Sequence, residues 1–200
     1  MAYNGGSIFI SSTGSVLDVA DSVFAGCGEG GVCALKGGAV YGDSSSKMIF
    51  KRTKFIGNKV SGHGGAIYAF CVLELTDSTF ISNNAGHGGA IAIKTIKDAG
   101  NSFIKDCTFT SNTAISGGGA LHSEIESSGS FEITDTKFEG NSASEAGAVY
   151  LQDGTTTFNS GITFINNLAT DAETNTLRTY GSGTALFTTC TSTEGSTIFF

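Results

Sequence analysis

The sequence predicts an all-β fold, a right-handed parallel β-helix of about six to seven coils, and three observations lead to this prediction. Two short motifs alternate along most of the chain, and successive copies of the first are 25 to 29 residues apart. Glycine is abundant, with 29 residues in 200, and proline is absent. No stretch keeps the apolar spacing of an amphipathic helix over three turns. Repeats of this length are typical of stacked supersecondary units that cannot bury their apolar faces alone.

The first motif is Phe-x-x-Asn, and the second is Gly-Gly-Ala followed by Ile, Leu or Val. The Phe-x-x-Asn copies occupy residues 55–58, 80–83, 109–112, 138–141 and 164–167, so their phenylalanines are 25, 29, 29 and 26 residues apart. A glycine copy begins eight or nine residues after each of the first four phenylalanines. The glycine copies begin at Gly37, Gly64, Gly88 and Gly118, and a weaker copy reads Ala146-Gly147-Ala148-Val149.

Each repeat predicts three short strands joined by three turns. Residues 72–76 alternate apolar and polar side chains, as a half-buried strand does. Residues 77–78 form a turn, residues 79–81 a second strand, and residues 82–87 carry turn chemistry again. The third strand starts at the Gly-Gly-Ala motif of residues 88–93. Because parallel β crossovers are almost always right-handed, the coil is expected to be right-handed too.

Equivalent residues of a parallel coil lie directly above one another, about 4.8 Å apart. We therefore expect an internal aromatic stack of Phe24, Phe55, Phe80, Phe109, Phe138 and Phe164. We also expect an internal amide ladder, at a bend, of Asn58, Asn83, Asn112, Asn141 and Asn167. Paired glycines suit a tight bend with positive φ. The motif residues are thus expected to be architectural, and function is expected on the outward faces and loops.

The repeat runs through the chain without a linker, so residues 1–200 are expected to form a single domain. The apolar end Ile198-Phe199-Phe200 lacks the polar cap that solenoids need, which suggests a fragment of a longer surface protein. A net charge of -7 disfavours nucleic acid as a partner. No apolar run reaches membrane-spanning length, so we expect no membrane insertion by this fragment. The oligomeric state stays open.

The five cysteines do not have the spacing of a zinc ribbon or of a disulfide framework. Cys71, Cys107 and Cys190 are isolated in the sequence and are expected to be buried free thiols. Cys27 and Cys33 are close enough to close a small loop, and both a disulfide and free thiols remain open for them.

Together the two motifs resemble the repeats of the chlamydial polymorphic membrane proteins, over about residues 5–186. That family consists of surface-displayed autotransporter passengers that act as adhesins, and its tetrapeptides are implicated in adhesion. The resemblance implies an extracellular location, with outer-membrane anchoring of the full-length protein. Two departures are Cys27 in place of the motif asparagine and Ala146 in place of glycine. By resemblance the adhesion motifs comprise Phe55, Asn58, Gly64, Gly65, Ala66, Ile67, Phe80, Asn83, Gly88, Gly89, Ala90, Ile91, Phe109, Asn112, Gly118, Gly119, Ala120, Leu121, Phe138 and Asn141.

Three functions suit such a rod, and the one predicted is adhesion to a cell-surface protein or glycan, without catalysis or cofactor. The alternative is a purely structural spacer. The third is a polysaccharide-active enzyme, because Gly-His-Gly at residues 62–64 and 86–88 resembles a polygalacturonase motif. That family's Asn-Thr-Asp, Asp-Asp and Arg-Ile-Lys elements are missing from the sequence, and no pair of facing carboxylates can be assembled. A projecting loop is expected at residues 171–180.

The candidate binding residues directly follow the glycine motifs, where Tyr41, Tyr68, His122 and Tyr150 recur and Ala92 interrupts the series. If the preceding aliphatic residue points inward, strand alternation points these side chains outward. We expect an outward aromatic row whose role is simple surface packing, and the alternative is that Tyr41, Tyr68, His122 and Tyr150 stack on sugars or anchor a protein partner.

Metal binding was weighed at two places, and no metal site is predicted. His63 and His87 hold the same register in adjacent coils and could offer two imidazoles to a transition metal, but the sequence supplies no third ligand. Asp77, Asp106 and Asp135 each stand three residues before a stacked phenylalanine. They are expected to cap turns, with a weak calcium site as the alternative.

Overall fold

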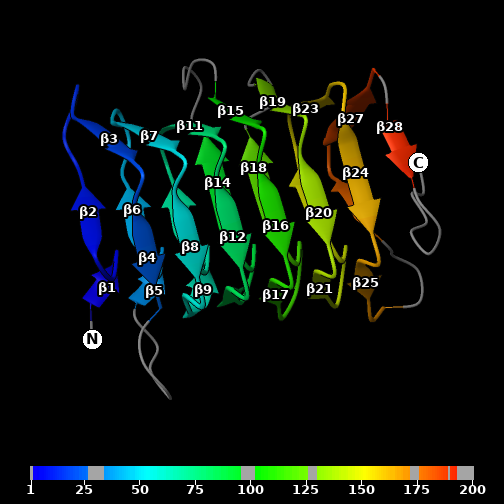
Figure 1. Ribbon diagram of the computed structural model, residues 1–200, viewed down its shortest axis with the longest axis horizontal. Helices are drawn as coiled ribbons and strands as arrows, with labels where there is room; N and C mark the ends of the chain where they lie inside the picture. The colour runs from blue at the N-terminus through cyan, green and yellow to red at the C-terminus, as the bar shows by residue number, and fades with distance from the viewer. Residues whose placement is uncertain are drawn as a thin grey trace.

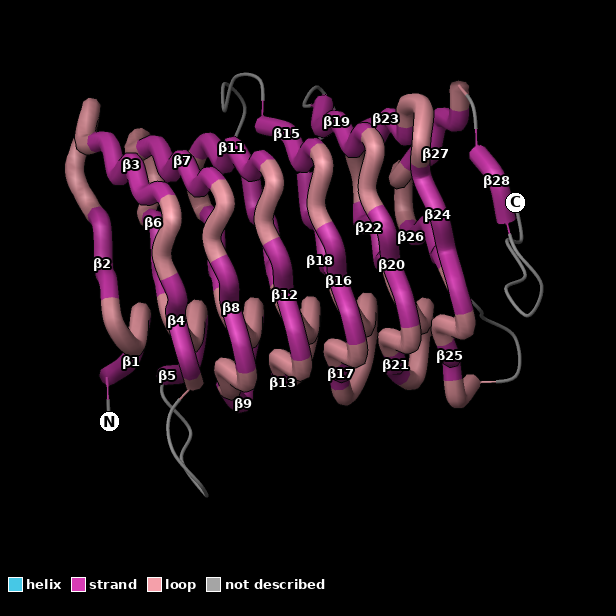
Figure 2. The backbone as a smooth tube through the Cα atoms, viewed as in Figure 1, coloured by secondary structure: helices cyan, strands magenta, loops and turns pink. Residues whose placement is uncertain are grey.

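The computed structural model describes residues 2–26, 34–95, 102–125, 130–171, 176–188 and 190–192. Over these residues the chain forms 28 β-strands and no helix, which confirms the all-β expectation (Figure 2). Successive coils are stacked along the long axis of the molecule, from the N-terminus to the C-terminus (Figure 1). Within each sheet, neighbouring strands come from successive coils and pair in parallel. The predicted parallel β-helix is therefore present.

Three long faces of the solenoid each contain seven strands. Face 1 follows the glycine motifs and contains β2 (Ile8–Ile10), β6 (Val40–Gly42), β10 (Ile67–Ala69), β14 (Ile91–Thr95), β18 (Leu121–Ile125), β22 (Val149–Gln152) and β26 (Leu177–Tyr180). Face 2 contains β3 (Val16–Ala20), β7 (Lys47–Lys51), β11 (Val72–Thr76), β15 (Ser102–Lys105), β19 (Ser130–Thr134), β23 (Thr155–Phe158) and β27 (Thr184–Phe187). Face 3 carries the motif phenylalanines and contains β4 (Val23–Ala25), β8 (Lys54–Ile56), β12 (Thr79–Ile81), β16 (Thr108–Thr110), β20 (Lys137–Glu139), β24 (Ile162–Ile165) and β28 (Cys190–Ser192).

A fourth, short face lies between the asparagine bend and the glycine bend. It consists of one sheet with β1 (Ala2–Asn4), β5 (Ala34–Lys36) and β9 (Val60–His63), and another with β13 (Asn84–Ala85), β17 (Thr113–Ala114), β21 (Ser142–Ala143) and β25 (Leu168–Ala169). The expectation of three strands per coil was therefore wrong, because residues 84–85 lie in a segment read as turn alone. Neighbouring coils supply strand partners in register, such as Thr113 for Asn84, and this pairing outweighs the local turn preference.

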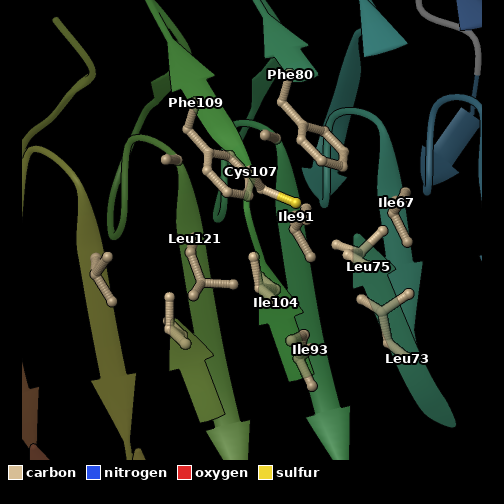
Figure 3. Packing of buried hydrophobic residues seen from close by; sticks show 14 of the residues in the cluster. Ile67, Leu73, Leu75, Phe80, Ile91, Ile93, Ile104, Cys107, Phe109 and Leu121 are labelled. Atoms are coloured by element: carbon tan, nitrogen blue, oxygen red, sulfur yellow. The ribbon is translucent and has the colours of Figure 1, made fainter. Parts of the chain in front are cut away.

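The interior is a dry stack of apolar side chains. Ring centroids of successive motif phenylalanines, from Phe24 to Phe164, lie 4.7 to 5.1 Å apart and nearly parallel, as expected. Figure 3 shows two of these rings, Phe80 and Phe109, beside the aliphatic side chains of faces 1 and 2. Burial of each ring stabilises the fold by roughly 2–3 kcal/mol. Cys71 and Cys107 are buried free thiols, as predicted, whereas Cys27 and Cys33 lie outside the described residues.

The asparagine ladder is also present. From Asn83 to Asn167, the Oδ1 atom of each ladder asparagine accepts hydrogen bonds from both the backbone N–H and the Nδ2 of the preceding one, at 2.8 to 3.0 Å. Each Nδ2 also donates to the carbonyl of an earlier motif phenylalanine, as Asn112 does to Phe80 at 3.0 Å. The ladder satisfies polar groups at a bend that water does not reach, because the asparagines are buried.

A second ladder, which the sequence reading missed, forms the turn before face 3. The residue at the turn has a left-handed backbone conformation, with φ near +50° at Asp21, Arg52, Asp77, Asp106 and Asp135. The next side chain is a hydroxyl or a thiol that donates to the carbonyl two residues earlier, as Ser78 does to Thr76. The aspartates were expected to cap these turns, yet for Asp77, Asp106 and Asp135 the neighbouring hydroxyl or thiol makes the turn contact.

The glycine bend requires its glycines at two successive positions. Gly64 has φ +66°, and a Cβ added at Gly65 would lie 2.0 Å from the carbonyl oxygen of Gly89 in the next coil. The coils therefore approach so closely that no other side chain fits. The last part of the segment expected as a loop, Leu177–Tyr180, is strand β26, and residues 172–175 lie outside the described residues. In the part of the chain that is described, no helix is long and apolar enough to cross a membrane.

Candidate functional site

The glycine bend brings the outward side chains of the short face against those of face 1. One column, on or beside the short face, runs in register through Lys36, His63, His87, Gly117 and Glu145. The other, on face 1, runs in register through Phe9, Tyr41, Tyr68, Ala92, His122, Tyr150 and Arg178. We call these two facing columns the corner.

Side-chain contacts join the two columns of the corner. The Lys36 Nζ lies 4.8 Å from the centre of the Tyr68 ring, a cation–π contact. Further along, the Arg178 guanidinium donates to Glu145 at 2.6 Å. Between these contacts stands Gly117, where an added Cβ would lie 3.0 Å from Cγ of Tyr150. The absent side chain at this position thus makes room for the tyrosine ring.

Rings follow one another along face 1. The Tyr41 ring stacks between Phe9, at 5.3 Å, and Tyr68, at 5.1 Å. Ala92 leaves a gap in this row, and beyond the gap His122 meets the edge of Tyr150 at 5.1 Å. Tyr41, Tyr68 and Ala92 form a small buried cluster separate from the main core. These rings therefore lie on the outer side of the sheet, as strand alternation predicted.

Of the two expectations, surface packing describes these rings better than an open, flat row. Only 8% of Tyr41, 5% of Tyr68 and 6% of His122 is exposed, and Tyr150 is half-buried. The physical reason is the bend, because it brings the side chains of the short-face column, such as Lys36 and His63, over the rings of face 1. Tyr41, Tyr68 and His122 are therefore covered, whereas Phe9 at the end of the row is 52% exposed.

The gap at Ala92 is occupied by histidines, and all three histidines of the chain meet there. The rings of His63 and His87 are stacked at 4.9 Å. His122 lies 5.1 Å from His87 and 6.2 Å from His63. Its Nε2 atom is buried without a hydrogen-bond partner. Sequence reasoning paired only the first two histidines, although the small Ala92 in an aromatic row was the signal that another ring fills the gap.

The histidines share one electrostatic environment that favours the neutral form. Burial, and then the neighbouring imidazoles, lower the pKa of His122 to about 3. Burial also lowers the pKa of His63, with further lowering by His87 and Lys36. Burial lowers the pKa of His87 too, whereas Glu145 acts in the opposite direction. Burial first of all raises the pKa of the Tyr68 phenol to about 12. The corner is thus built from uncharged rings at neutral pH.

The residues named as adhesion motifs lie elsewhere. The motif phenylalanines, asparagines, alanines and aliphatic residues are at most 2% exposed, and most are in the main core or the asparagine ladder. The motif glycines form the bends. No motif side chain of this kind is placed to touch a ligand directly, so an adhesive role would have to act through the shape that these residues impose.

A more open column runs along the outside of face 2. In register it contains Asp18, Ile49, Glu74, Phe103, Glu132, Thr157 and Leu186. Acidic and apolar residues alternate over its first five positions. Asp18, Glu132 and Leu186 are exposed and the others half-buried. We call this column the face 2 stripe.

The described residues show no group of three His, Cys, Asp or Glu side chains arranged to hold a metal ion. The carboxylates that act on the histidines are already paired. Glu124 lies 2.7 Å from the Lys94 ammonium, and Glu145 is bound to Arg178.

Comparison with known proteins gives one match. A family model described as the right handed beta helix region matches residues 6–192. No curated protein matches the chain, and no solved structure matches it. The matched description agrees with the handedness that the sequence predicted.

Proposed function

Because the chain belongs to the right-handed β-helix family, we propose that it is an extracellular, non-catalytic binding rod that attaches to a protein or glycan on another surface. The resemblance of its two motifs to adhesin repeats supports this proposal. So does the acidic surface, which suits protein or sugar partners better than nucleic acid.

The observation that carries the proposal is the contrast between a repeating interior and a non-repeating exterior. Inside, one phenylalanine and one asparagine recur in coil after coil. Outside, the face 2 stripe changes residue type at each step. A rod of this kind presents a long, varied surface on a stiff support, so that several weak contacts add up to avidity.

A spacer rod is the second candidate, and the continuity of the ladders favours it. The described asparagines form an unbroken chain of hydrogen bonds from Asn58 to Asn167. Such a chain resists bending whether or not the outer surface binds anything. Spacer and adhesin differ in whether this chain alone retains a ligand.

The test incubates the immobilised chain with surface glycans and extracellular-matrix proteins and identifies the retained molecules by mass spectrometry. Retention without cleavage supports the binding rod. Retention of nothing favours the spacer, and a cleaved sugar favours a polysaccharide-active enzyme.

Surface variants then locate the contact. Phe103→Ser and Leu186→Ser remove apolar side chains from the face 2 stripe, and each is expected to weaken binding by more than about 1 kcal/mol if the stripe carries the contact. Ile56→Ser on face 3 is the matched control, because Ile56 is also partly exposed but lies on another face. Equal losses in all three variants would show that the stripe is not the contact surface.

A further inference from the structure

We propose that His63, His87 and His122 form an acid-sensitive latch, which covers the rings of the corner at neutral pH and uncovers them in mildly acidic medium. The inference concerns the free chain and does not depend on the proposed binding function.

The geometry shows why the latch is closed when the imidazoles are neutral. His63 and His87 come from the short-face column and lie against His122 of face 1, within 6.2 Å between ring centres. His63 also meets the edge of Tyr68 at 6.2 Å. The two short-face histidines are half-buried, whereas His122 is almost completely buried beneath them. They therefore act as its lid.

Protonation is unfavourable in this arrangement because little negative charge is available. The charged groups that face the cluster are Lys36 and Glu145 from the short-face column, and Lys94, Glu124 and Arg178 from face 1. Both carboxylates are held in ion pairs with Lys94 and Arg178. A second or third imidazolium would thus stand beside like charge, at a distance where repulsion in a partly buried site is strong.

The order of events follows from exposure. His63 and His87 are closer to solvent, so they take up protons before His122 does. Once charged, their side chains gain by rotating into water, which removes the cover from His122. The uncovered His122 then regains a pKa closer to 6.5 and protonates in turn. This coupling makes the opening cooperative rather than a sum of three independent titrations.

The opening moves side chains and leaves the coil intact. The backbone on either side of the bend is held by bonds between coils, such as Gly64 N–H to the His87 carbonyl at 2.9 Å. At Gly65 the two coils approach so closely that an added Cβ would lie 2.0 Å from the Gly89 carbonyl oxygen, and the backbone hydrogen bonds between the coils do not involve the histidine side chains. Loss of the lid therefore exposes Tyr68 and its neighbours without unwinding the solenoid.

The experiment follows histidine protonation and tyrosine exposure on the intact chain. The chain has three histidines, five tyrosines and no tryptophan, so histidine NMR signals and tyrosine fluorescence can both be read without labels. We expect acrylamide quenching of the tyrosines to rise on going from about pH 7.5 to about pH 5, with a midpoint between about pH 5 and 6.5. Far-UV circular dichroism stays constant over this range. EDTA in the buffer excludes metal binding as the cause.

The double variant His63→Gln/His87→Gln keeps polar side chains of similar length but cannot titrate, so its quenching should not respond to pH. Glu132→Gln, which removes an exposed carboxylate on face 2, is the control and should behave as the unmodified chain. Three results would each overturn the latch. They are independent titration of the histidines near their ordinary pKa without a change in quenching, a persistent response in the double variant, and loss of β-structure over the same range.

Discussion

The interior stack and the outer corner are both columns of rings one coil apart, yet they are built on different rules. Inside, six successive coils contribute the same ring, from Phe24 to Phe164, and the spacing stays between 4.7 and 5.1 Å. At the corner the residue type changes along the column, and ring spacing ranges from 4.9 to 6.4 Å with parallel, tilted and edge-on pairs.

The difference comes from what each column must satisfy. A dry interior tolerates neither a void nor an unpaired polar group, so each coil repeats the residue that fits. The corner lies beside water and can accept a missing ring at Ala92, because a side chain from the facing column fills the gap. The interior stack therefore requires the same residue in successive coils, whereas the corner requires only that side chains of the two facing columns fit together.

The largest expected effect breaks the interior stack. Phe109→Ala should lower the free energy of unfolding by about 4 kcal/mol, because it opens a cavity between two neighbouring rings. Phe9→Ala removes a ring that is also stacked at 5.3 Å but is 52% exposed. It should cost less than about 1 kcal/mol. Urea unfolding followed by circular dichroism measures both, and similar losses would contradict the distinction between interior and corner.

A smaller loss is expected from the asparagine ladder. Asn112→Ala leaves the Asn83 N–H and Nδ2 without their acceptor, in a buried site. It should lower the free energy of unfolding by about 3 kcal/mol. Asn84→Ala is the matched control, because that half-buried amide has a single bond, to the Thr113 hydroxyl. Its loss should stay below about 1 kcal/mol. If Asn84→Ala lowers the free energy of unfolding as much as Asn112→Ala does, burial of the ladder is not the reason for its stabilising effect.

These two predictions concern the part of the molecule that the sequence allowed us to anticipate. The ring stack and the amide ladder follow from period and residue type alone, because equivalent residues in parallel coils must lie above one another. The hydroxyl and thiol ladder escaped notice, since Thr53, Ser78 and Cys107 share a role without sharing a residue type.

The corner was only half predictable. Strand alternation placed Tyr68 and His122 on the outer side correctly. Their burial depends on the angle of the glycine bend, and no repeat pattern specifies an angle. The meeting of His63 with His122 joins positions in different columns and coils, so no fixed sequence spacing announces it.

The third prediction is a dependence of stability on pH. The lowered pKa of His122 means that the unfolded chain binds a proton between about pH 6.5 and 3 that the closed chain does not. The free energy of unfolding should therefore fall as the pH drops from about 6.5, by at most about 1.4 kcal/mol per pH unit for each such histidine, until the corner opens and His122 of the folded chain also takes up a proton. His122→Phe keeps a ring at this position but removes the titrating imidazole. The free energy of unfolding of this variant should therefore depend less steeply on pH. Identical slopes in urea titrations at several pH values would contradict this account.

The smallest effects on stability are expected from two arginine–carboxylate ion pairs, Arg52–Asp21 and Arg178–Glu145. Arg52 binds Asp21 through two hydrogen bonds, but both side chains are more than half exposed, so Arg52→Gln should leave the melting temperature unchanged at physiological salt. Arg178→Gln should also change stability little, yet it frees Glu145 from its cation. The presence of Glu145 raises the pKa of His87, and without Arg178 that effect strengthens. The acid transition of tyrosine quenching should then move to higher pH in this variant alone. An unchanged midpoint would mean that the charge of Glu145 does not affect the pKa of His87. The Glu145–Arg178 pair would then have as little effect on the corner as the exposed Arg52–Asp21 pair has on stability.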